Sequence, residues 1–237
     1  MARVARVVAV DYPHHITQRG NNHQIVFSDD SDYPKYLSFV KKYSQEYDLG
    51  ICCYCLMPNH VHFIAIPHNE FSLAKTFNFA HMRYSQYFNK KQRQCGHLWQ
   101  GRFYSCVLDE PHLVMAAQYI ERNPVRAKIV KKAQDWKWSS ANYNTGKQKN
   151  DLVINTPLFG YISETQSTWE RRLEKQDEEN DMEAIRRNTK TGLPLGKDKF
   201  ILRLEEEMGR ELQSKPRGRP WLKEKSILAA PIKTKEK

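Results

Sequence analysis

The alternation of hydrophobic and polar positions divides the first half of the chain into short strands and amphipathic helices. Residues 14–18 are predicted to end a first strand, and the apolar runs 51–56 and 60–66 predict a hairpin around residues 57–59. A further strand is predicted near residues 103–108. This order indicates an α+β fold with a mainly antiparallel sheet flanked by helices.

Three amphipathic helices are predicted between and after these strands. The first is capped by Ser31 and stops at Gly50, and the second covers residues 72–89 with Ser72 as its cap. The third begins at the cap Asp109 and ends before Pro124, because the residue preceding a proline disfavours the helical region.

The second half of the chain is less regular. Residues 167–187 and 197–213 predict charged helices, and Trp136 and Trp138 are expected to pack back onto the first domain. We therefore expect a catalytic α+β domain over 1–145, a helical C-terminal extension over 146–214 and a flexible basic tail over 215–237.

The charge balance adds a partner class to this picture. Lys and Arg number 38 against 27 Asp and Glu, a net charge of +11, which is typical of proteins that bind polyanions such as nucleic acids. A soluble protein with a basic surface is the alternative. Because no apolar stretch reaches the ~18 residues that span a bilayer, the sequence predicts no membrane partner.

The cysteines indicate a reducing compartment. Five are present, an odd number, and Cys52, Cys53 and Cys55 lie in one apolar run, which predicts reduced thiols in a cytoplasmic protein. The spacing of Cys52 and Cys55 also fits half of a zinc site, whereas buried strand cysteines are the simpler interpretation.

The triplet His60-Val61-His62 is the most informative chemical pattern. Side chains at positions i and i+2 of a strand project to the same side, so both imidazoles could bind one ion. Such a pair suits a divalent metal. Two hydrogen-bonded strand histidines with no metal are the alternative.

The surrounding segment, Leu56-Met57-Pro58-Asn59-His60-Val61-His62-Phe63-Ile64, resembles the HUH motif of single-tyrosine transposases, and more narrowly the REP-associated tyrosine transposase family. The resemblance extends, in the family's order, to residues 17–21 (TQRGN), 98–103 (LWQGRF) and 119–127 (YIERNPVRA). It covers residues 1–145 strongly. The segments 191–196 (TGLPLG) and 218–220 (GRP), with Phe200 between them, also resemble the family's C-terminal extension.

The resemblance implies an HUH fold, also called an RRM-like palm. It also implies a metal-dependent endonuclease and strand transferase that cuts single-stranded DNA through a 5′-phosphotyrosine intermediate. By motif position, Tyr119 is the catalytic nucleophile, and the ligands of Mg²⁺ or Mn²⁺ are His60, His62 and Asn123. Tyr119 and Asn123 lie one helical turn apart on one face. Related transposases have glutamine at this third ligand position, so the shorter Asn123 leaves direct ligation open.

The residues alone leave several of these roles open. Without the resemblance, Tyr84, Tyr87 and Tyr104 compete with Tyr119 as the nucleophile. The general base is not determined, and the candidates are His15, Glu121 and a metal-bound water.

The expected partner is single-stranded DNA with hairpins of the palindromic-repeat type, and the resemblance favours a monomer, with a dimer as the alternative. The protein is expected in the bacterial cytoplasm, associated with the nucleoid. The candidate DNA-binding residues are Arg19, Lys75, Arg83, Trp99, Arg102, Arg122, Arg126, Arg217 and Arg219. For each cation a solvated surface position is the alternative, and for Trp99 the alternative is a core position.

Two other functions remain compatible with the sequence. One is a DNA-binding regulator that has lost catalysis, and the other is a metal-dependent nuclease that uses water and forms no covalent adduct.

Overall fold

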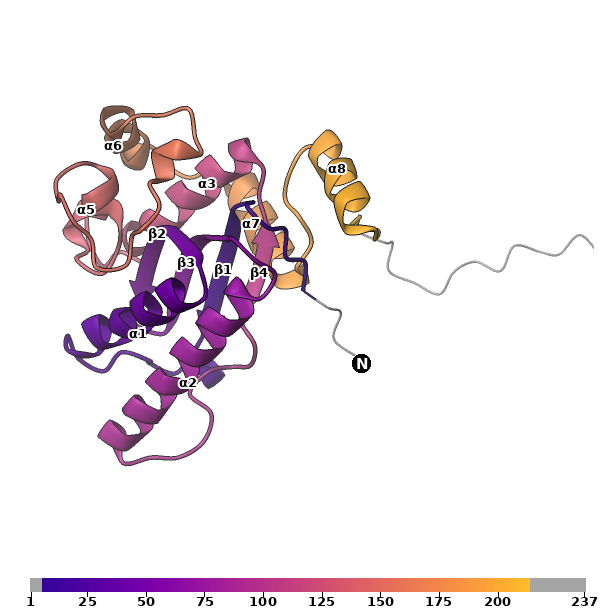
Figure 1. Ribbon diagram of the computed structural model, residues 1–237. Helices are drawn as coiled ribbons and strands as arrows, with labels where there is room; N and C mark the ends of the chain where they lie inside the picture. The colour runs from indigo at the N-terminus through magenta and orange to yellow at the C-terminus, as the bar shows by residue number, and fades with distance from the viewer. Residues whose placement is uncertain (1–5, 214–237) are drawn as a thin grey trace, which may run out of the picture.

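A computed structural model describes residues 6–213 of the chain (Figure 1). The strands in this range are β1 (His14–Arg19), β2 (Leu49–Met57), β3 (His60–Pro67) and β4 (Tyr104–Val107). All pair antiparallel in one sheet of order β2-β3-β1-β4. The predicted α+β fold with an antiparallel sheet is confirmed.

The helices of the first half are α1 (Asp32–Glu46), α2 (Ser72–Gln92), α3 (Glu110–Glu121) and α4 (Asn123–Arg126). Those of the second half are α5 (Ala141–Asn144), α6 (Gln166–Glu174), α7 (Glu179–Thr191) and α8 (Asp198–Met208). Short 3₁₀ turns lie at Asn21–His23, Ala133–Asp135 and Leu158–Gly160. Within residues 6–213, no helix combines the length and the apolar character needed to cross a membrane.

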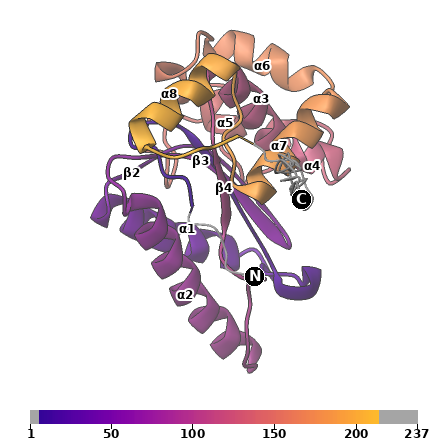
Figure 2. The ribbon, with the colours of Figure 1, turned by 90° about the vertical axis from the view of Figure 1, so that its right-hand side faces the viewer.

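The sheet separates two hydrophobic cores. Figures 1 and 2 show α1 and α2 on one face of the sheet and α3, α6 and α7 on the other. Along β3, Val61 and Phe63 join the core under α1 and α2, whereas Ile64 joins the core under α3, α6 and α7. Because side chains alternate along a strand, His60 and His62 share the face of Ile64. The histidine pair therefore faces α3.

The cysteines of β2 belong to the second core. A register shift between Ile51 and Cys53 marks a β-bulge, and Cys52, Cys53 and Cys55 are all buried in that core. Burial raises the pKa of the Cys52 thiol to about 12. These residues are packed strand cysteines, and no group of three or more His, Cys, Asp or Glu side chains within residues 6–213 is arranged to hold a metal.

The helix caps agree with the sequence in one case of three. The Asp109 side chain accepts a hydrogen bond of 3.1 Å from the His112 backbone N–H, so it caps α3 as predicted. Ser31 makes no such bond. Ser72 lies inside α2, where its hydroxyl donates to the Asp48 carbonyl at 2.9 Å. It anchors the start of the helix to the segment before β2.

The C-terminal extension packs directly on the second core. Trp169 of α6 is fully buried there, together with Leu173 and Ile185. The helix predicted over 167–187 is interrupted between α6 and α7, at residues 175–178. The reason for the break is an ion pair in this connection, described below.

A glycine ends α7 and returns the chain to the sheet. Gly192 adopts a left-handed conformation with φ of 77°, which favours glycine. The Leu195 backbone N–H then donates to the Val107 carbonyl at 2.8 Å, and Leu195 forms a parallel bridge with Leu108. The segment with the predicted C-terminal motif thus covers the end of β4.

A buried carboxylate connects the second core to the extension. Glu121, the last residue of α3, is fully buried. It accepts hydrogen bonds from the Ser140 hydroxyl (2.5 Å), the Asn144 amide (2.7 Å) and the Trp169 indole (2.8 Å). Burial raises the pKa of Glu121, and these hydrogen bonds act in the opposite direction.

Replacing Glu121 with Ala should therefore destabilise the fold. The substitution leaves the Trp169, Ser140 and Asn144 donors buried without this acceptor, which should lower the free energy of unfolding by about 2–4 kcal/mol. Urea denaturation followed by circular dichroism measures this change. The control Glu183→Ala, at an exposed position of α7, should shift stability by less than about 0.5 kcal/mol. Equal effects of the two substitutions would contradict this role.

Candidate active site

Two histidines of β3 form the centre of the candidate site. The ring centroids of His60 and His62 are 5.0 Å apart and the rings are nearly perpendicular. His60 Nδ1 donates to Asn59 Oδ1 at 2.6 Å. This bond fixes the ring and leaves His60 Nε2 as an acceptor.

A chain of hydrogen bonds holds the second histidine. His62 Nδ1 and His15 Nε2 are 2.9 Å apart, and His15 Nδ1 is 2.7 Å from the hydroxyl oxygen of Thr189 in α7. That hydroxyl is in turn 3.3 Å from Cys106 Sγ. Both nitrogens of His15 are therefore occupied, and Nε2 of His62 stays outside this chain.

The three histidines of this cluster are held uncharged. Burial lowers the pKa of His15 and of His60 to about 3, and for His60 the Arg19 and Arg126 guanidiniums add to the effect. The pKa of His62 is lowered for the same reasons, with burial as the largest cause. Neutral imidazoles at pH 7 are the form that binds metal ions.

Tyr119 lies beside the histidines. It is on α3, one position before the buried Ile120, and its own side chain is largely buried. Its ring centroid is 5.7 Å from that of His62 and 6.2 Å from that of His15, both in edge-to-face geometry. The helix thus presents the tyrosine to the same face of the sheet on which the histidines lie.

Two guanidiniums surround the tyrosine ring. Arg126 Cζ is 4.1 Å from the Tyr119 ring centroid, and its Nη2 donates to the Tyr119 carbonyl at 2.8 Å. From α7, Arg186 Cζ is 5.8 Å from the same centroid. The pKa of Arg186 is raised, chiefly because its side chain hydrogen bonds to Tyr119. Each guanidinium also pairs with a carboxylate, Arg126 with Asp177 at 2.9 Å and Arg186 with Glu179 at 3.3 Å, so the two positive charges beside the ring are partly balanced.

Asp177 positions one of these guanidiniums. Its carboxylate accepts from Arg126 Nη1 at 2.9 Å and from Arg122 Nε at 3.1 Å. Arg122 also donates to the Leu173 carbonyl. Asp177 lies in the connection between α6 and α7, so this ion pair explains why the predicted long helix is broken there.

Asn123 completes the group, one helical turn after Tyr119. Its Nδ2 is 3.4 Å from His60 Nε2. The amide, which also carries a carbonyl oxygen, thus lies at the ring nitrogen that His60 leaves free. The structure brings together all four residues predicted for catalysis and metal binding, Tyr119, His60, His62 and Asn123.

Comparison with known families agrees with this arrangement. Residues 9–123 match the family described as "Transposase IS200 like". This part of the chain, just under half of its length, is similar to that family. The matched segment includes the histidine pair, Tyr119 and Asn123 but ends before Arg126, Asp177 and Arg186. No curated protein sequence matches the chain.

One solved structure of low sequence identity shows the same fold. The structure of a REP-associated tyrosine transposase bound to a REP hairpin is 18% identical, with a TM-score of 0.51, and the match covers 67% of this chain and 93% of that one. A transposase structure from Deinococcus radiodurans R1 is also 18% identical, with a TM-score of 0.35, and its match covers 51% of this chain and 96% of that one.

The tyrosines that compete with Tyr119 in the sequence make other contacts. The Tyr84 hydroxyl donates to the Val26 carbonyl inside the first core, and the Tyr87 hydroxyl donates to Asp32 Oδ1 at 3.1 Å. Tyr104 is on the edge strand β4. Among the tyrosines of residues 6–213, Tyr119 is the one whose ring packs against both His62 and His15.

Two candidates for the general base are already engaged. Glu121 is fully buried, and its carboxylate accepts hydrogen bonds from Ser140, Asn144, Trp169 and the Cys53 thiol. Both ring nitrogens of His15 have partners. Neither residue offers a free acceptor to the Tyr119 hydroxyl.

The predicted DNA-binding residues divide into three groups. Arg19 pairs with His60 across β1 and β3 and is exposed, and Arg126 lies over Tyr119, so both border the site. Arg102 is exposed in the loop before β4, whereas Lys75 and Arg83 lie on α2, across the sheet from the histidines. Arg217 and Arg219 lie outside the described residues, as does the predicted tail.

The structure disagrees with two of these predictions. Trp99 is 8% exposed and packs against Tyr36 and His81 in the first core, so its ring offers no free face to a base. Arg122 is 7% exposed and is engaged by Asp177 and Leu173. Both residues stabilise the fold.

The sequence did not indicate that residues of the C-terminal extension reach the site. Thr189, Arg186 and Asp177 reach the site from α7 and the connection before it. They are more than fifty positions from Tyr119 along the chain, in segments whose pattern predicts charged surface helices. No spacing rule links such residues to the site.

Neutralising Asp177 should weaken this arrangement. Asp177→Asn leaves the largely buried Arg122 without an ionic partner, since the two side chains are 9% and 8% exposed. We expect a loss of about 1–3 kcal/mol in the free energy of unfolding by urea denaturation. Asp181→Asn, on the first turn of α7, is the matched control and should change it by less than about 0.5 kcal/mol. An Asp177→Asn protein as stable as the parent would refute the positioning role.

Proposed function

We propose that this protein is a metal-dependent endonuclease and strand transferase that cuts single-stranded DNA through a covalent bond to Tyr119. The convergence of Tyr119, His60, His62 and Asn123 on one face of the sheet is the observation that supports this function. The IS200-like transposase family of residues 9–123 agrees with DNA as the substrate class.

The residues present fit a divalent cation. His60 and His62 are uncharged, their Nδ1 atoms are occupied by Asn59 and His15, and their Nε2 atoms lie outside those bonds. Such partners on the far nitrogen orient metal-binding histidines in many proteins. His60, His62 and the Asn123 carbonyl oxygen would hold Mg²⁺ or Mn²⁺, which accept imidazole and oxygen ligands.

The hydrogen-bond chain has one direction that suits this role. If His62 Nδ1 donates to His15 Nε2, then His15 Nδ1 donates to the Thr189 hydroxyl, and that hydroxyl donates to Cys106 Sγ. Every donor then has an acceptor, and His62 Nε2 keeps its lone pair. Thr189 and His15 are positioning residues for His62 in this scheme.

The reaction is an in-line displacement at phosphorus. The Tyr119 oxygen bonds to the phosphorus, the bond from phosphorus to the 3′ oxygen breaks, and that oxygen takes a proton from water and leaves as a 3′-hydroxyl. The phenol proton passes to water, and the protein holds the 5′ phosphate as a phosphotyrosine. When bound, a divalent cation supplies positive charge that offsets the charge developing on the phosphate oxygens. Attack by another 3′-hydroxyl reverses the step and joins strands.

Arg126 and Arg186 act on the nucleophile and the phosphate. Both guanidiniums lie at the Tyr119 ring, where a fixed positive charge stabilises the phenolate and then the phosphate that replaces its proton. Asp177 holds Arg126 in this position.

The preferred DNA is single-stranded next to a hairpin. This specificity rests on the REP-associated transposase of similar fold, which was solved with a REP hairpin. The exposed Arg19 beside His60 and the guanidiniums at Tyr119 provide the positive surface that such a backbone requires.

The decisive test is covalent adduct formation. With hairpin DNA labelled at either end and Mg²⁺ or Mn²⁺, a denaturing gel should show a protein–DNA adduct that Tyr119→Phe and chelation abolish. His62→Ala should abolish it as well. Tyr87→Phe, a tyrosine of the other face, should retain the adduct.

Other outcomes point to other functions. Metal-dependent cleavage with no adduct indicates a nuclease that uses water. Tight binding without cleavage of varied hairpins indicates a DNA-binding regulator.

A second prediction concerns Arg186, which lies outside the family match. Arg186→Gln should slow adduct formation about 10-fold or more, because it removes a positive charge at the reacting oxygen. Arg187→Gln removes the same charge one position along α7, at an exposed arginine whose Nε bonds to Asn188 Oδ1, and should leave the rate unchanged. Single-turnover kinetics at saturating DNA measures both rates. Equal rates for the two variants would exclude Arg186 from the reaction.

A further inference from the structure

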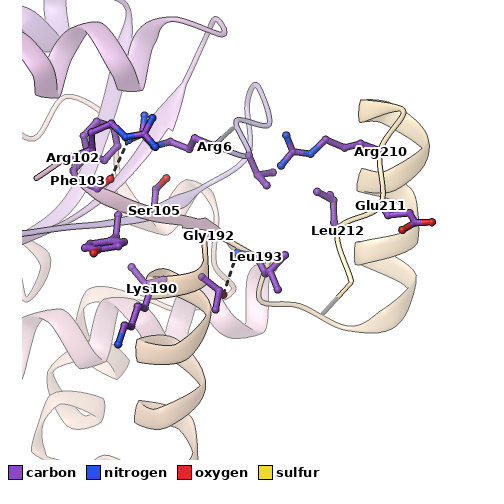
Figure 3. A pocket seen from close by; sticks show the side chains of 14 residues that line it. Arg6, Arg102, Phe103, Ser105, Lys190, Gly192, Leu193, Arg210, Glu211 and Leu212 are labelled. Atoms are coloured by element: carbon purple, nitrogen blue, oxygen red, sulfur yellow. Dashed lines mark hydrogen bonds between the residues drawn. The ribbon is translucent and has the colours of Figure 1, made fainter. Parts of the chain in front are cut away.

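A pocket of about 530 Å³ lies beside the edge strand β4, apart from the histidines and Tyr119 (Figure 3). Its walls come from the N-terminal segment at Arg6, from residues 102–105, from the end of α7 at residues 189–193, and from residues 210–212. β4 is the outer strand of the sheet, and the bridge from Leu195 covers only its far end at Leu108. The pocket is the open part of that edge.

Positive charge gathers on the walls of this pocket. Arg6 lies 3.6 Å above the Phe103 ring centroid and donates to the Phe103 carbonyl at 3.0 Å. Arg102 and Lys190 add two further cations. Burial, and then the neighbouring Arg102, lower the pKa of Arg6 to about 10. Arg6 and Arg102 are close enough for their charges to interact, and such a pair favours the binding of an anion.

Carboxylates do not neutralise these cations. In the described range 6–213, no ion pair is recorded for Arg6, Arg102 or Lys190. The lining also contains Arg210 and Glu211, whose formal charges offset each other. Figure 3 shows the Glu211 carboxylate directed away from Arg6 and Arg102.

A buried hydroxyl of β4 also lines this pocket. Ser105 of β4 is 2% exposed and lines the pocket, and its Oγ makes no hydrogen bond within the described residues. Buried polar groups in proteins are nearly always hydrogen bonded, so a ligand that accepts a hydrogen bond would satisfy this one. The donors of this pocket are thus arginine, lysine and hydroxyl groups, which are suited to a phosphate.

An aromatic ring completes the lining. Tyr104 is 41% exposed and borders the same pocket as Arg102. Exposed aromatic rings beside cations are the usual stacking surface for unpaired bases. Phosphate donors and a stacking surface together match a nucleotide.

The pocket and the candidate active site share a residue and a face of the sheet. Thr189 lines the pocket and also hydrogen bonds to His15, which holds His62. Across the sheet, His62 pairs with Thr17 and Thr17 pairs with Tyr104, so the three side chains share one face. At the usual strand spacing Tyr104 is about 10 Å from His62.

We propose that this pocket binds one unpaired nucleotide of the DNA strand that Tyr119 attacks, with its phosphate at Arg102 and Lys190 and its base on Tyr104. The inference rests on the proposed function for the identity of the strand. It adds a subsite at the β4 edge that fixes how the single-stranded flank leaves the catalytic centre.

Binding measurements in a Tyr119→Phe background test the subsite without cleavage. The probes are a fluorescent DNA hairpin with single-stranded flanks and the same hairpin without flanks, and the readout is anisotropy over a range of salt. For the flanked probe, Arg102→Gln/Lys190→Gln should make the slope of log affinity against log salt shallower by about 0.7, since one phosphate contact to a single strand is lost and each contributes about 0.7. Tyr104→Ser should weaken binding about 5-fold or more.

Matched variants remove the same number of cations, or an aromatic ring, from positions outside the pocket. Lys41→Gln/Lys42→Gln removes two cations from exposed positions of α1, and Phe71→Ser removes an exposed ring at the start of α2. Both should bind the flanked probe as the parent does. Tyr104→Phe, which keeps the ring, should restore the loss seen with Tyr104→Ser. Thermal melting shows that each variant is folded.

Three results would overturn the subsite. The first is that the pocket and control variants behave alike, and the second is that the flanked and unflanked hairpins lose affinity equally. The third is that dTMP alone saturates the parent but not the double variant, because the occupant is then a free nucleotide. Adduct formation by the parent with Tyr119 intact is measured separately. If the parent forms the adduct but the pocket variants bind DNA as the parent does, the subsite alone is refuted. If the pocket variants bind more weakly but the parent forms no adduct, the proposed chemistry alone is refuted.

Discussion

A fully buried carboxylate holds the parts of this protein together. Glu121 ends the helix that presents Tyr119, and its oxygens accept hydrogen bonds from Ser140, Asn144 and Trp169. A charge with no solvent contact is costly unless hydrogen bonds replace its hydration, so these donors have little freedom to move away. The position of Tyr119 relative to the sheet therefore depends on residues of the later half of the chain.

The same dependence is visible in the candidate active site. The sheet supplies His15, His60 and His62, and α3 supplies Tyr119. The extension then adds Thr189 behind His15, and Arg186 and Asp177 around the tyrosine. The segment of the IS200-like family ends at residue 123, before all three of these positions. The extension therefore supplies residues to the candidate site.

The sequence was sufficient to predict the sheet and the shared face of the histidine pair, because each follows from local rules. The choice of Tyr119 among the tyrosines came from its place in a motif that resembles a known family. Alternation along 60–66 places His60 and His62 on one face, and Asp109 starts α3 so that Tyr119 and Asn123 follow one turn apart. Other features depend on contacts between distant segments. Trp99 and Arg122 have the composition of DNA-binding residues, and only the packing of the first core and the ion pair with Asp177 reveal their structural roles. The break in the predicted helix 167–187 has the same origin.

The central claim is that Tyr119 becomes covalently attached to a DNA 5′ phosphate. The most direct measurement is mass spectrometry of the adduct after digestion with trypsin and nuclease. The account predicts a nucleotide joined through its 5′ phosphate to the peptide that contains Tyr119. A nucleotide on the peptide of another tyrosine, or one joined through its 3′ phosphate, would contradict it.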